Sequence, residues 1–424
     1  DKRSKAVREL APTVSKAFLD VLPAAAVPVY VNECLIAGDD AGLADLAHWQ
    51  TKMCALKLLI DCSKKAPRDI EAMMTSLVPV ISSIMWDSKA EIRTQAADTL
   101  EDVCDAIDNV DLEPFIPAMV EAIQKPDTVA DCVYALAGTT FVQTVTASAL
   151  SITVPILERG FKEPKTAIKR KCAVITENMA KLVKNPADVA PFLPIVMPLL
   201  TKGMDTIADP ECRQRFTAAQ EILTRVSQLG AEAAPPTVEV ADLTAELNKT
   251  ITTTTEGAKA VGAYVVQIAA QLVNVARNVD KKIWAAGLVQ LLTPIAGSNA
   301  ETAVEALRVF AQSKSGISED GTTATLCADD DEDDPTPDLC DLQFSLAYGS
   351  NILLNNSRLH LKKGYKYGII ATKSAGKTTM MRAISNNQVE GFPYKDVRTI
   401  FIENDIQGSQ MSMNVVEFLL DTMG

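Results

Sequence analysis

One stretch of the chain has the residue types and spacing that hold a phosphate group. Residues 367–370, Tyr-Gly-Ile-Ile, form an apolar run that predicts a strand, and a helix-like segment follows Gly376-Lys377-Thr378-Thr379. A short loop between a strand and a helix points its backbone N–H groups and the helix N-terminus at an anion. The pattern therefore predicts a phosphate-binding loop of the kind that holds a nucleoside triphosphate.

Each residue type in this loop has an expected role. Lys377 is expected to reach the β- and γ-phosphates, and the hydroxyl of Thr378 is expected to ligate Mg²⁺. Ala371 stands where the pattern G-x-x-x-x-G-K-[ST] has its first glycine, and alanine fits a tight turn only where φ is negative. The alternative interpretation is a chance GKT sequence after a buried strand. The expected nucleotide-binding residues of the loop are Ala371, Thr372, Lys373, Ser374, Ala375, Gly376, Lys377, Thr378 and Thr379.

Composition narrows the class of protein. A chain of 424 residues is expected to form two to four domains. The net charge of −13 excludes a protein that binds nucleic acid through its overall charge, so any such contact must come from local basic faces. No signal peptide and no apolar run of membrane-spanning length is apparent. We therefore expect a cytoplasmic protein that makes no membrane contact. We also expect it to be monomeric. Because the chain starts without Met and within a helical pattern, we also expect that residues precede it.

The cysteines and histidines do not form a recognisable metal site. None of the nine cysteines forms a C-x-x-C pair, and His48 and His360 are far apart with no cysteine at ligand spacing. Most of the cysteines lie in apolar helical patterns, where a reduced thiol behaves as a small hydrophobe. We expect free thiols, as in cytosolic proteins.

The first half of the chain repeats with a period near 40 residues. Pro79, Pro117, Pro155 and Pro194 are 38, 38 and 39 residues apart, and each is expected near the start of an apolar helix that a turn and a second helix follow. This period is the signature of HEAT or armadillo repeats, in which a helix pair buries its apolar face only against its neighbours. We predict an all-α HEAT-repeat solenoid over residues 1–234. A helical bundle with coincidental prolines is the alternative.

The repeat pattern also predicts the solenoid's interior and its turns. Apolar residues at i, i+3 and i+4 spacing are expected to form one continuous core. The core positions include Val80, Ile84, Ala96, Leu100 and Val103. In the turn of the first regular repeat, Asp87 is expected to pair with Arg93. Less regular helix pairs at 1–37 and 43–77 are expected to extend the stack.

Three further segments follow the solenoid. Residues 237–316 have few charges and short connections, which predicts a four-helix bundle. Residues 317–338 contain the acidic run DDDEDD and are expected to be a flexible linker, because like charges repel and stay solvated. Residues 339–424 change to strand-like alternation, and 397–405 predicts another strand. This last segment is expected to begin an α/β phosphate-loop domain.

A basic cluster stands out in this acidic chain. It consists of Lys162, Lys165, Lys169, Arg170 and Lys171. A solvated helix face is the simpler interpretation of such a run. Five positive charges within ten residues can instead neutralise several phosphates. We therefore treat the cluster as a candidate RNA-binding surface.

Several segments resemble the fungal-type translation elongation factor 3 family of HEAT-repeat, ABC-type ATPases. The segments are MWDSKAEIR at 85–93, FIPAMVEAI at 115–123, TVTASALSITVPILERG at 144–160, IKRKCAVITENMAKLV at 168–183, TIADPE at 206–211, FSLAYGSNILLN at 344–355 and MMRAISNNQVEGFP at 380–393. The predicted order of HEAT repeats, bundle, acidic linker and the start of an ABC-type ATPase domain is similar to the N-terminal portion of that family. The resemblance covers the chain from 1 to 424, most closely 79–225 and 339–405.

The resemblance implies a cytosolic, ribosome-bound ATPase with two ABC domains that assists release of deacylated tRNA from the exit site. It implies ATP and Mg²⁺ as cofactors. The implied partner is the ribosome, through ribosomal RNA and small-subunit proteins, with tRNA affected indirectly. In the family the loop reads G-P-N-G-x-G-K-[ST]. This chain matches that pattern at Gly376, Lys377 and Thr378 and departs from it at 371–374.

The resemblance also points to two site residues outside the loop. Tyr348 falls where ABC domains place an aromatic ring that stacks on adenine, although an ordinary strand aromatic is an equal alternative. Asn404 falls where these ATPases place a polar residue that contacts Mg²⁺ and water. The sequence contains no LSGG signature, Walker B acid pair or switch histidine, so ATP turnover is expected only of the complete protein. The alternative function is a non-catalytic HEAT-repeat scaffold that binds ribosomes and has a degenerate nucleotide-binding domain.

Overall fold

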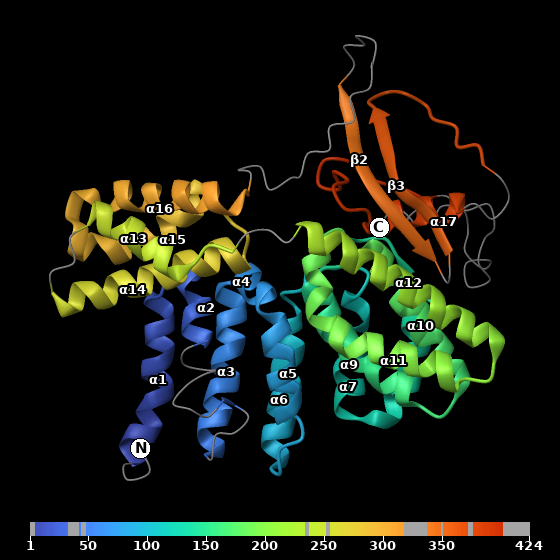
Figure 1. Ribbon diagram of the computed structural model, residues 1–424, viewed down its shortest axis with the longest axis horizontal. Helices are drawn as coiled ribbons and strands as arrows, with labels where there is room; N and C mark the ends of the chain where they lie inside the picture. Colours follow the sequence, from blue (N-terminus) through green and yellow to red (C-terminus); the bar gives the residue numbers. More distant parts are fainter. Residues whose placement is uncertain are drawn as a thin grey trace, which may run out of the picture.

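The computed structural model describes two kinds of architecture, a long array of helices and a small sheet with one helix packed on it (Figure 1). The described residues are 5–32, 42–43, 48–233, 237–251, 255–317, 337–348, 351–371 and 376–401. Most of the predicted acidic linker, residues 318–336, lies outside the described residues.

The first part of the chain is a stack of helices in which successive pairs lie side by side (Figure 1). Its helices are α1 (Lys5–Val21), α2 (Val27–Tyr30), α3 (Trp49–Lys65), α4 (Pro67–Ala72), α5 (Met74–Ile84), α6 (Ala90–Cys104), α7 (Ile116–Gln124), α8 (Val129–Ala137), α9 (Ala147–Lys162), α10 (Thr166–Leu182), α11 (Leu193–Thr206) and α12 (Pro210–Ala233). The regular pairs are α5–α6, α7–α8, α9–α10 and α11–α12, and each pair contacts the next. This is the helical solenoid that the proline period predicts.

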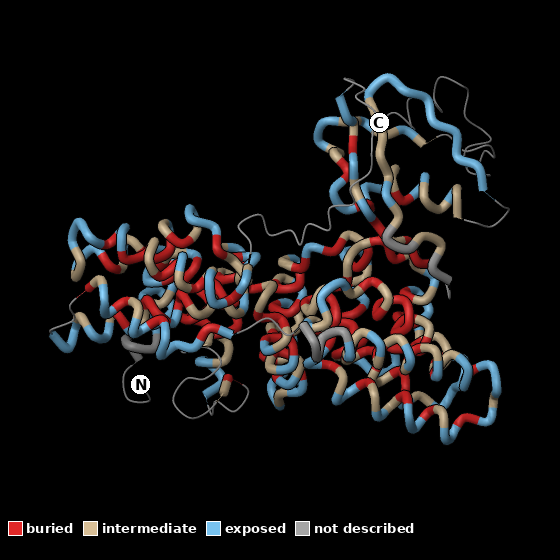
Figure 2. Tube along the Cα trace, turned by 45° about the horizontal axis from the view of Figure 1, so that its top comes forward, coloured by how far each residue is buried: buried red, intermediate tan, exposed pale blue. Residues whose placement is uncertain are grey.

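One aliphatic core runs through the solenoid, between its layers of helices (Figure 2). Ile84, Ala96, Leu100 and Val103 are buried, and Val80 is half-buried against the same core. Burying a Leu or Ile side chain stabilises a fold by about 1.5–3 kcal/mol. The predicted interior is therefore confirmed, with Val80 at its edge.

The repeating prolines occupy two different helix positions. Pro117 and Pro194 are the second residues of α7 and α11, where the missing N–H would have no helical partner. Pro79 and Pro155 lie well inside α5 and α9 instead. The prediction that each proline stands near a helix start is wrong for these two. Helix α9 begins eight residues before Pro155 because the segment before that proline is buried almost throughout, and this packing offsets the lost hydrogen bond.

The turn between α5 and α6 is held differently from the prediction. The carboxylate of Asp87 pairs with Nζ of Lys52 at 2.8 Å and accepts a hydrogen bond from the backbone N–H of Lys89 at 2.9 Å. Nη1 of Arg93 donates to the carbonyl oxygens of Asp87 and Ser88 at 2.9 and 3.1 Å. The predicted side-chain pair of Asp87 and Arg93 is therefore wrong, because this carboxylate satisfies an N–H at the start of α6 and a cation from α3.

The next four helices form a bundle in which each helix packs against two others (Figure 1). They are α13 (Val240–Thr250), α14 (Glu256–Ala270), α15 (Lys281–Ala296) and α16 (Ala300–Ser315). Trp284 is fully buried in this bundle, and its Nε1 donates to the carbonyl of Asn278 at 2.8 Å. Asp280 caps α15 by accepting hydrogen bonds from the N–H groups of Lys282 and Ile283.

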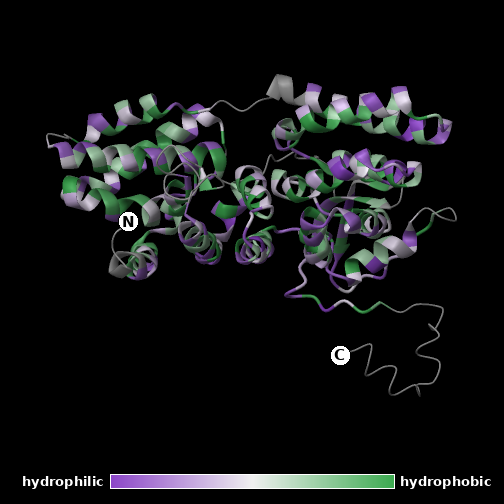
Figure 3. Ribbon diagram, turned by 90° about the horizontal axis from the view of Figure 1, so that it is seen from below, coloured by the Kyte–Doolittle hydropathy of each residue, from purple (hydrophilic) through white to green (hydrophobic). Residues whose placement is uncertain are grey.

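One helix in the described part of the chain, Glu256–Val275, is long and apolar enough to cross a membrane by length and composition. This corrects the prediction that no such run exists. The helix packs against α13 and α15, with Val265, Val266 and Ile268 fully buried. Figure 3 shows the apolar faces of the bundle helices. The helix is a core helix of the bundle, because its apolar side chains contact protein.

The sheet joins segments that are far apart in the sequence. Strands β2 (Asp338–Tyr348) and β3 (Asn351–Lys362) form an antiparallel hairpin, and the short strand β1 (Thr140–Phe141) of the solenoid pairs with the end of β2. The order is β1-β2-β3, and helix α17 (Lys377–Ser385) lies beside the hairpin (Figure 1).

The strand predicted at 367–370 is not formed, and neither is the described part, 397–401, of the strand predicted at 397–405. Residues 365–371 have no regular structure, and Ile370 is 98% exposed. Residues 397–401 are also irregular, and 402–405 lie outside the described residues. A strand requires a neighbour to accept and donate its backbone hydrogen bonds. Among the described residues, neither segment pairs with β1, β2 or β3, so its backbone groups have no partner in the sheet.

Candidate functional site

The predicted phosphate loop ends in a glycine that its surroundings require. Gly376 has φ +88° and is the residue before α17. A Cβ at this position would lie 2.8 Å from Cδ1 of Leu353 on β3. Glycine is needed both for the left-handed turn and for the close approach to β3. The N-terminus of α17 is therefore held against the hairpin.

Lys377 reaches back across the loop. Its Nζ donates to the carbonyl oxygen of Ala371 at 2.7 Å, so the first and last parts of the loop lie close together. Thr372 to Ala375 lie outside the described residues. The only described non-glycine residues with positive φ are Arg277 and Asn387, so the backbone of Ala371 suits alanine.

The start of α17 offers the groups that a phosphate needs. The backbone N–H groups in the first turn of a helix have no helical acceptor, and the helix dipole favours an anion there. The side chain of Thr378 is exposed on this first turn, and Thr379 is half-buried. The ammonium of Lys377, the first-turn N–H groups and the hydroxyl of Thr378 thus lie within one turn, which is the donor set for a phosphate and its Mg²⁺.

The two residues predicted from family resemblance are only partly located. Tyr348 is the last residue of β2, and its backbone lies between β1 and β3, opposite Thr140 and Asn351. Its stacking on adenine stays a prediction. Asn404 lies outside the described residues, so its contact with Mg²⁺ also stays a prediction.

The structure brings the basic cluster together around the turn between α9 and α10. Lys162 pairs with Glu158 at 2.6 Å, and Arg170 pairs with Glu211 at 2.8 Å. Lys165 is exposed at the N-terminus of α10, and Lys169 is half-buried on its first turn. Exposed ion pairs contribute only about 0–1 kcal/mol, so a phosphate could displace these carboxylates at small cost.

Sequence reasoning missed two exposed aromatic residues that lie against cations of α9 and α10, one of them against Lys171 of the cluster. Nζ of Lys171 lies 4.8 Å from the ring centre of Tyr134, and the guanidinium of Arg159 lies 5.6 Å from that of Trp86. The two rings are 45% and 55% exposed. Rings beside cations can stack on unpaired bases. Trp86 follows an apolar helix directly and precedes Asp87 in the turn, and this was the signal available in the sequence.

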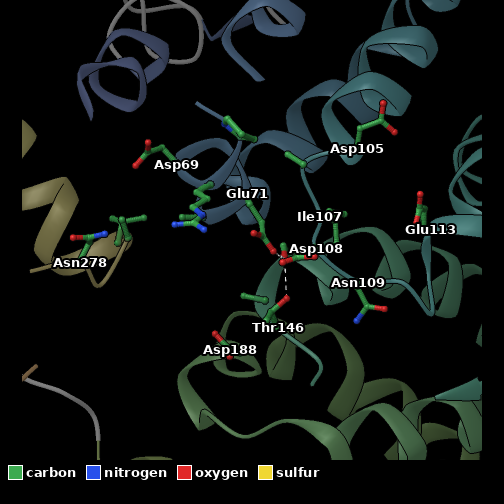
Figure 4. A pocket seen from close by; sticks show the side chains of 18 of the residues that line it. Asp69, Glu71, Asp105, Ile107, Asp108, Asn109, Glu113, Thr146, Asp188 and Asn278 are labelled. Atoms are coloured by element: carbon green, nitrogen blue, oxygen red, sulfur yellow. Dashed lines mark hydrogen bonds between the residues drawn. The ribbon is translucent and has the colours of Figure 1, made fainter. Parts of the chain in front are cut away.

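A large cavity of about 950 Å³ lies where the solenoid meets the bundle (Figure 4). Its ionisable lining is mostly acidic: Arg68, Asp69, Glu71, Asp105, Asp108, Glu113 and Asp188. The hydroxyl of Ser148 donates to Glu71 at 2.8 Å. Burial raises the pKa of the Asp69 carboxyl to about 6 and also raises the pKa of Glu71. Because carboxylates repel phosphates, this cavity is unsuited to a nucleotide.

The described cysteines are free thiols, as expected. Burial raises the pKa of Cys62 to about 12 and that of Cys132 to about 11. The thiolate is the reactive form of cysteine. These side chains therefore stay protonated and serve as core residues.

Comparison with known protein families identifies the repeats. The model described as "Elongation factor 3/GNC1 HEAT repeat" matches residues 127–234, and the model described as "EF3 N-terminal HEAT repeat" matches residues 1–100. The HEAT-repeat class of the solenoid, predicted from the proline period, is therefore confirmed.

Individual relatives extend the similarity beyond the repeats. The chain is 38% identical to elongation factor 3 of Phytophthora infestans over 395 residues, which are 89% of this chain and 36% of the relative. It is 38% identical to elongation factor 3B of Saccharomyces cerevisiae over 378 residues, 88% of this chain and 35% of the relative. For elongation factor 3 of Candida albicans the identity is 37% over 387 residues, 89% of this chain and 36% of the relative. The chain spans little more than a third of the length of these relatives, and its resemblance to their N-terminal portion is confirmed.

Proposed function

We propose that this chain, a relative of elongation factor 3, is the N-terminal part of a cytoplasmic translation elongation factor. The complete protein would bind ribosomes and use ATP binding and hydrolysis to promote release of deacylated tRNA from the exit site. The single observation that carries this proposal is the similarity, at 38% identity over 89% of the chain, to a protein named elongation factor 3.

The nucleotide-binding part of the proposal concerns residues 371–379. In it, the first-turn N–H groups of α17 and the ammonium of Lys377 hold the phosphates, and the hydroxyl of Thr378 ligates Mg²⁺. The left-handed turn at Gly376 and the reach of Lys377 back to Ala371 support this assignment. Bound Mg²⁺ would neutralise phosphate charge and help to orient the triphosphate.

We also propose that residues 339–424 are the first part of an ABC-type ATPase domain. An antiparallel hairpin that precedes the loop and a helix that begins at Lys377 support it. By the same proposal, residues 1–234 are the solenoid domain, 237–316 the bundle and 317–338 an acidic linker.

The ribosome is the proposed partner, with RNA contacted by the basic cluster. The support is the gathering of Lys162, Lys165, Lys169, Arg170 and Lys171 around one turn, next to the exposed ring of Tyr134. Lys162 and Arg170 form ion pairs with exposed carboxylates, which reduce the positive charge of the cluster. Because exposed ion pairs are weak, RNA phosphates can still replace these carboxylates.

The alternative is a ribosome-binding scaffold whose nucleotide site has degenerated. The departure of residues 371–374 from the family pattern favours it. The deciding experiment compares ATP binding and ribosome-stimulated ATP turnover in the full-length protein and its Lys377→Ala variant. The elongation-factor proposal expects a parent that binds and hydrolyses ATP and a variant that does not. A parent that co-sediments with ribosomes but never binds ATP would establish the scaffold.

A further inference from the structure

We propose that Asp111 and the segment 140–144 form a joint between the solenoid and the unit that contains α17, and that this joint couples the phosphate loop to the solenoid. The joint itself consists of contacts between described residues and does not depend on nucleotide binding. The coupling rests on the proposed nucleotide binding, so the two parts are tested separately.

The backbone makes the first connection. Strand β1, between α8 and α9 of the solenoid, adds to the edge of β2 with Thr140 opposite Tyr348 and Phe141 opposite Ala347. The side chains of Phe141 and Ala347 are 2% and 0% exposed. A strand added to a sheet edge fixes register and orientation through main-chain hydrogen bonds. The solenoid thus supplies one strand of the sheet.

The apolar cores interlock at the same place. Val142 of the solenoid is 4% exposed and belongs to the small core formed by the hairpin, α17 and the segment after it, which includes Phe344 and Ala383. In the opposite direction, Ala347 of β2 belongs to the core of the solenoid. Neither unit can move away from the other without exposing a buried side chain.

Asp111 is the polar centre of the joint. It is 2% exposed, and its Oδ2 accepts hydrogen bonds from the backbone N–H groups of Val142 at 2.6 Å and Gln143 at 2.8 Å. Its Oδ1 accepts a hydrogen bond from Nε2 of Gln388 at 3.3 Å. A buried carboxylate is costly unless its oxygens are paired. The carboxylate therefore favours one arrangement of the solenoid segment and of Gln388.

Gln388 connects this centre to the phosphate loop. It follows α17 by three residues, and its backbone N–H donates to the carbonyl of Ala383 within that helix. Asn387, with φ +57°, makes the left-handed turn that separates Gln388 from the helix. Helix α17 has nine residues and so spans about 13 Å from Lys377 to this turn. A rigid helix of that length would transmit a shift at its N-terminus to the contact with Asp111.

Glu390 makes two exposed polar contacts beside the joint. Oε2 of Glu390 accepts a hydrogen bond from the hydroxyl of Thr144 at 2.8 Å and lies 3.6 Å from Nζ of Lys184. Exposed contacts of this kind contribute little. The contact of the buried Asp111 with the half-buried Gln388 is therefore the one to test.

Two substitutions, made singly and together, move the carboxylate from position 111 to position 388 and test the joint. Gln388→Glu places a second carboxylate, at a half-buried position, against the buried carboxylate of Asp111. In Asp111→Asn the asparagine oxygen can still face the two backbone N–H groups, and Gln388 can turn its amide to accept from the new NH₂ group. In the double variant that NH₂ group can donate to the carboxylate introduced by Gln388→Glu, in the place of the original contact. Asn386→Asp adds the same charge at an exposed position two residues away and is the matched control.

Amide hydrogen exchange of residues 139–145 in the full-length protein is the readout. We expect exchange on the order of tenfold faster in Gln388→Glu, and rates near those of the parent in the double variant and the control. Equal exchange in the parent and Gln388→Glu, or a double variant as fast as Gln388→Glu, would overturn the joint. Far-UV circular dichroism and melting curves of each variant show whether it is folded.

The coupling has its own test in the same protein. Adding Mg²⁺ and a non-hydrolysable ATP analogue should change the exchange of residues 139–145 in the parent, and Gln388→Glu should abolish this change while still binding the analogue. A parent that binds the analogue without any change in 139–145 would overturn the coupling. A parent that does not bind the analogue would overturn the proposed function, and with it the coupling, while the exchange rates without nucleotide still decide the joint.

Discussion

Oδ1 of Asp111 accepts a hydrogen bond from Nε2 of Gln388, although the two residues are 277 positions apart in the chain. Asp111 precedes α7 in the solenoid, and Gln388 follows the helix that begins at Lys377. The contact joins the solenoid, which carries the basic cluster proposed to meet the ribosome, to the segment after the helix that begins at the loop proposed to hold ATP. Any ATP-driven movement of the loop relative to the solenoid has to pass through this region or break it.

The loop predicts a graded response to substitution. In the full-length protein, Lys377→Ala should abolish ATP turnover, because loss of one electrostatic contact in a transition state costs about 3–4 kcal/mol, a factor of 10²–10³. Thr378→Ala should weaken Mg²⁺-dependent binding, and Ala371→Gly should tighten binding. ATP affinity and turnover measure these effects, with Lys395→Ala, at an exposed position, as the control. The ATPase interpretation would be contradicted if the parent, Lys377→Ala and Ala371→Gly all failed to bind and to hydrolyse ATP.

Gly376 should tolerate no side chain. Gly376→Ala puts a Cβ into a left-handed backbone, at φ +88°, and 2.8 Å from Leu353. The expected destabilisation of α17 is roughly 1–3 kcal/mol, seen as faster amide exchange in residues 377–385. Adding Leu353→Ala removes the contacts with Cδ1 and Cγ but leaves the Cβ of residue 353 at 2.9 Å and does not change the backbone strain, so the double variant should recover only part of the loss. Full recovery would show that neither the remaining contact nor the backbone conformation matters.

The basic cluster predicts a salt-dependent contact with RNA. Changing Lys169, Arg170 and Lys171 to Glu should weaken co-sedimentation with ribosomes, most clearly at low salt, because fewer phosphates are then neutralised.

The matched control for that triple variant changes Lys249, Lys259 and Lys282 of the bundle to Glu, which alters the net charge by the same amount. Ribosome binding should be near that of the parent in the control. Binding that falls equally in both triple variants would indicate a response to overall charge, and unchanged binding in the cluster variant would remove the cluster as a contact.

The acidic cavity predicts a pH-dependent stability. Burial raises the pKa of Asp69 to about 6, above about 3.9 for an unfolded chain. The folded state therefore binds this proton more tightly. The resulting stability is present below about pH 4 and is lost as the pH rises through about 6.

Asp69→Asn should remove the loss of folding stability that accompanies ionisation of Asp69 above about pH 6. Because the side chain is only partly buried, we expect the variant to be more stable than the parent by about 1–2 kcal/mol at pH 7.5, and by little at pH 4. Chemical denaturation at the two pH values measures the difference, with Asp98→Asn at an exposed position as the control. A gain of the same size at both pH values would refute the assignment to the Asp69 proton.

Sequence patterns predicted features that depend on neighbours along the chain. The helices at Pro117 and Pro194 and the core positions Leu100 and Val103 follow from local periodicity. The prediction of a strand at 367–370 was wrong, because a strand needs partner strands elsewhere in the fold and an apolar run in the sequence does not reveal them. The need for glycine at position 376 was predictable, because the motif requires glycine there. Its close approach to Leu353 was not predictable from the sequence.

Side-chain partners were the least predictable features. Asp87 was expected to pair with Arg93, which is nearby in sequence, but its carboxylate pairs with Lys52 of another helix. The position of Asp111 was not predictable, because an isolated aspartate before an apolar helix resembles an ordinary turn residue. Its burial follows from the strand that the solenoid adds to β2, a contact between distant segments.

The most direct test of the account is release of deacylated tRNA from the exit site of purified ribosomes by the full-length protein. We predict release in the presence of ATP with the parent, and none above the spontaneous rate with Lys377→Ala, although both proteins co-sediment with ribosomes. Release at the same rate without ATP, or with Lys377→Ala, would contradict the claim that this chain begins an ATP-driven elongation factor.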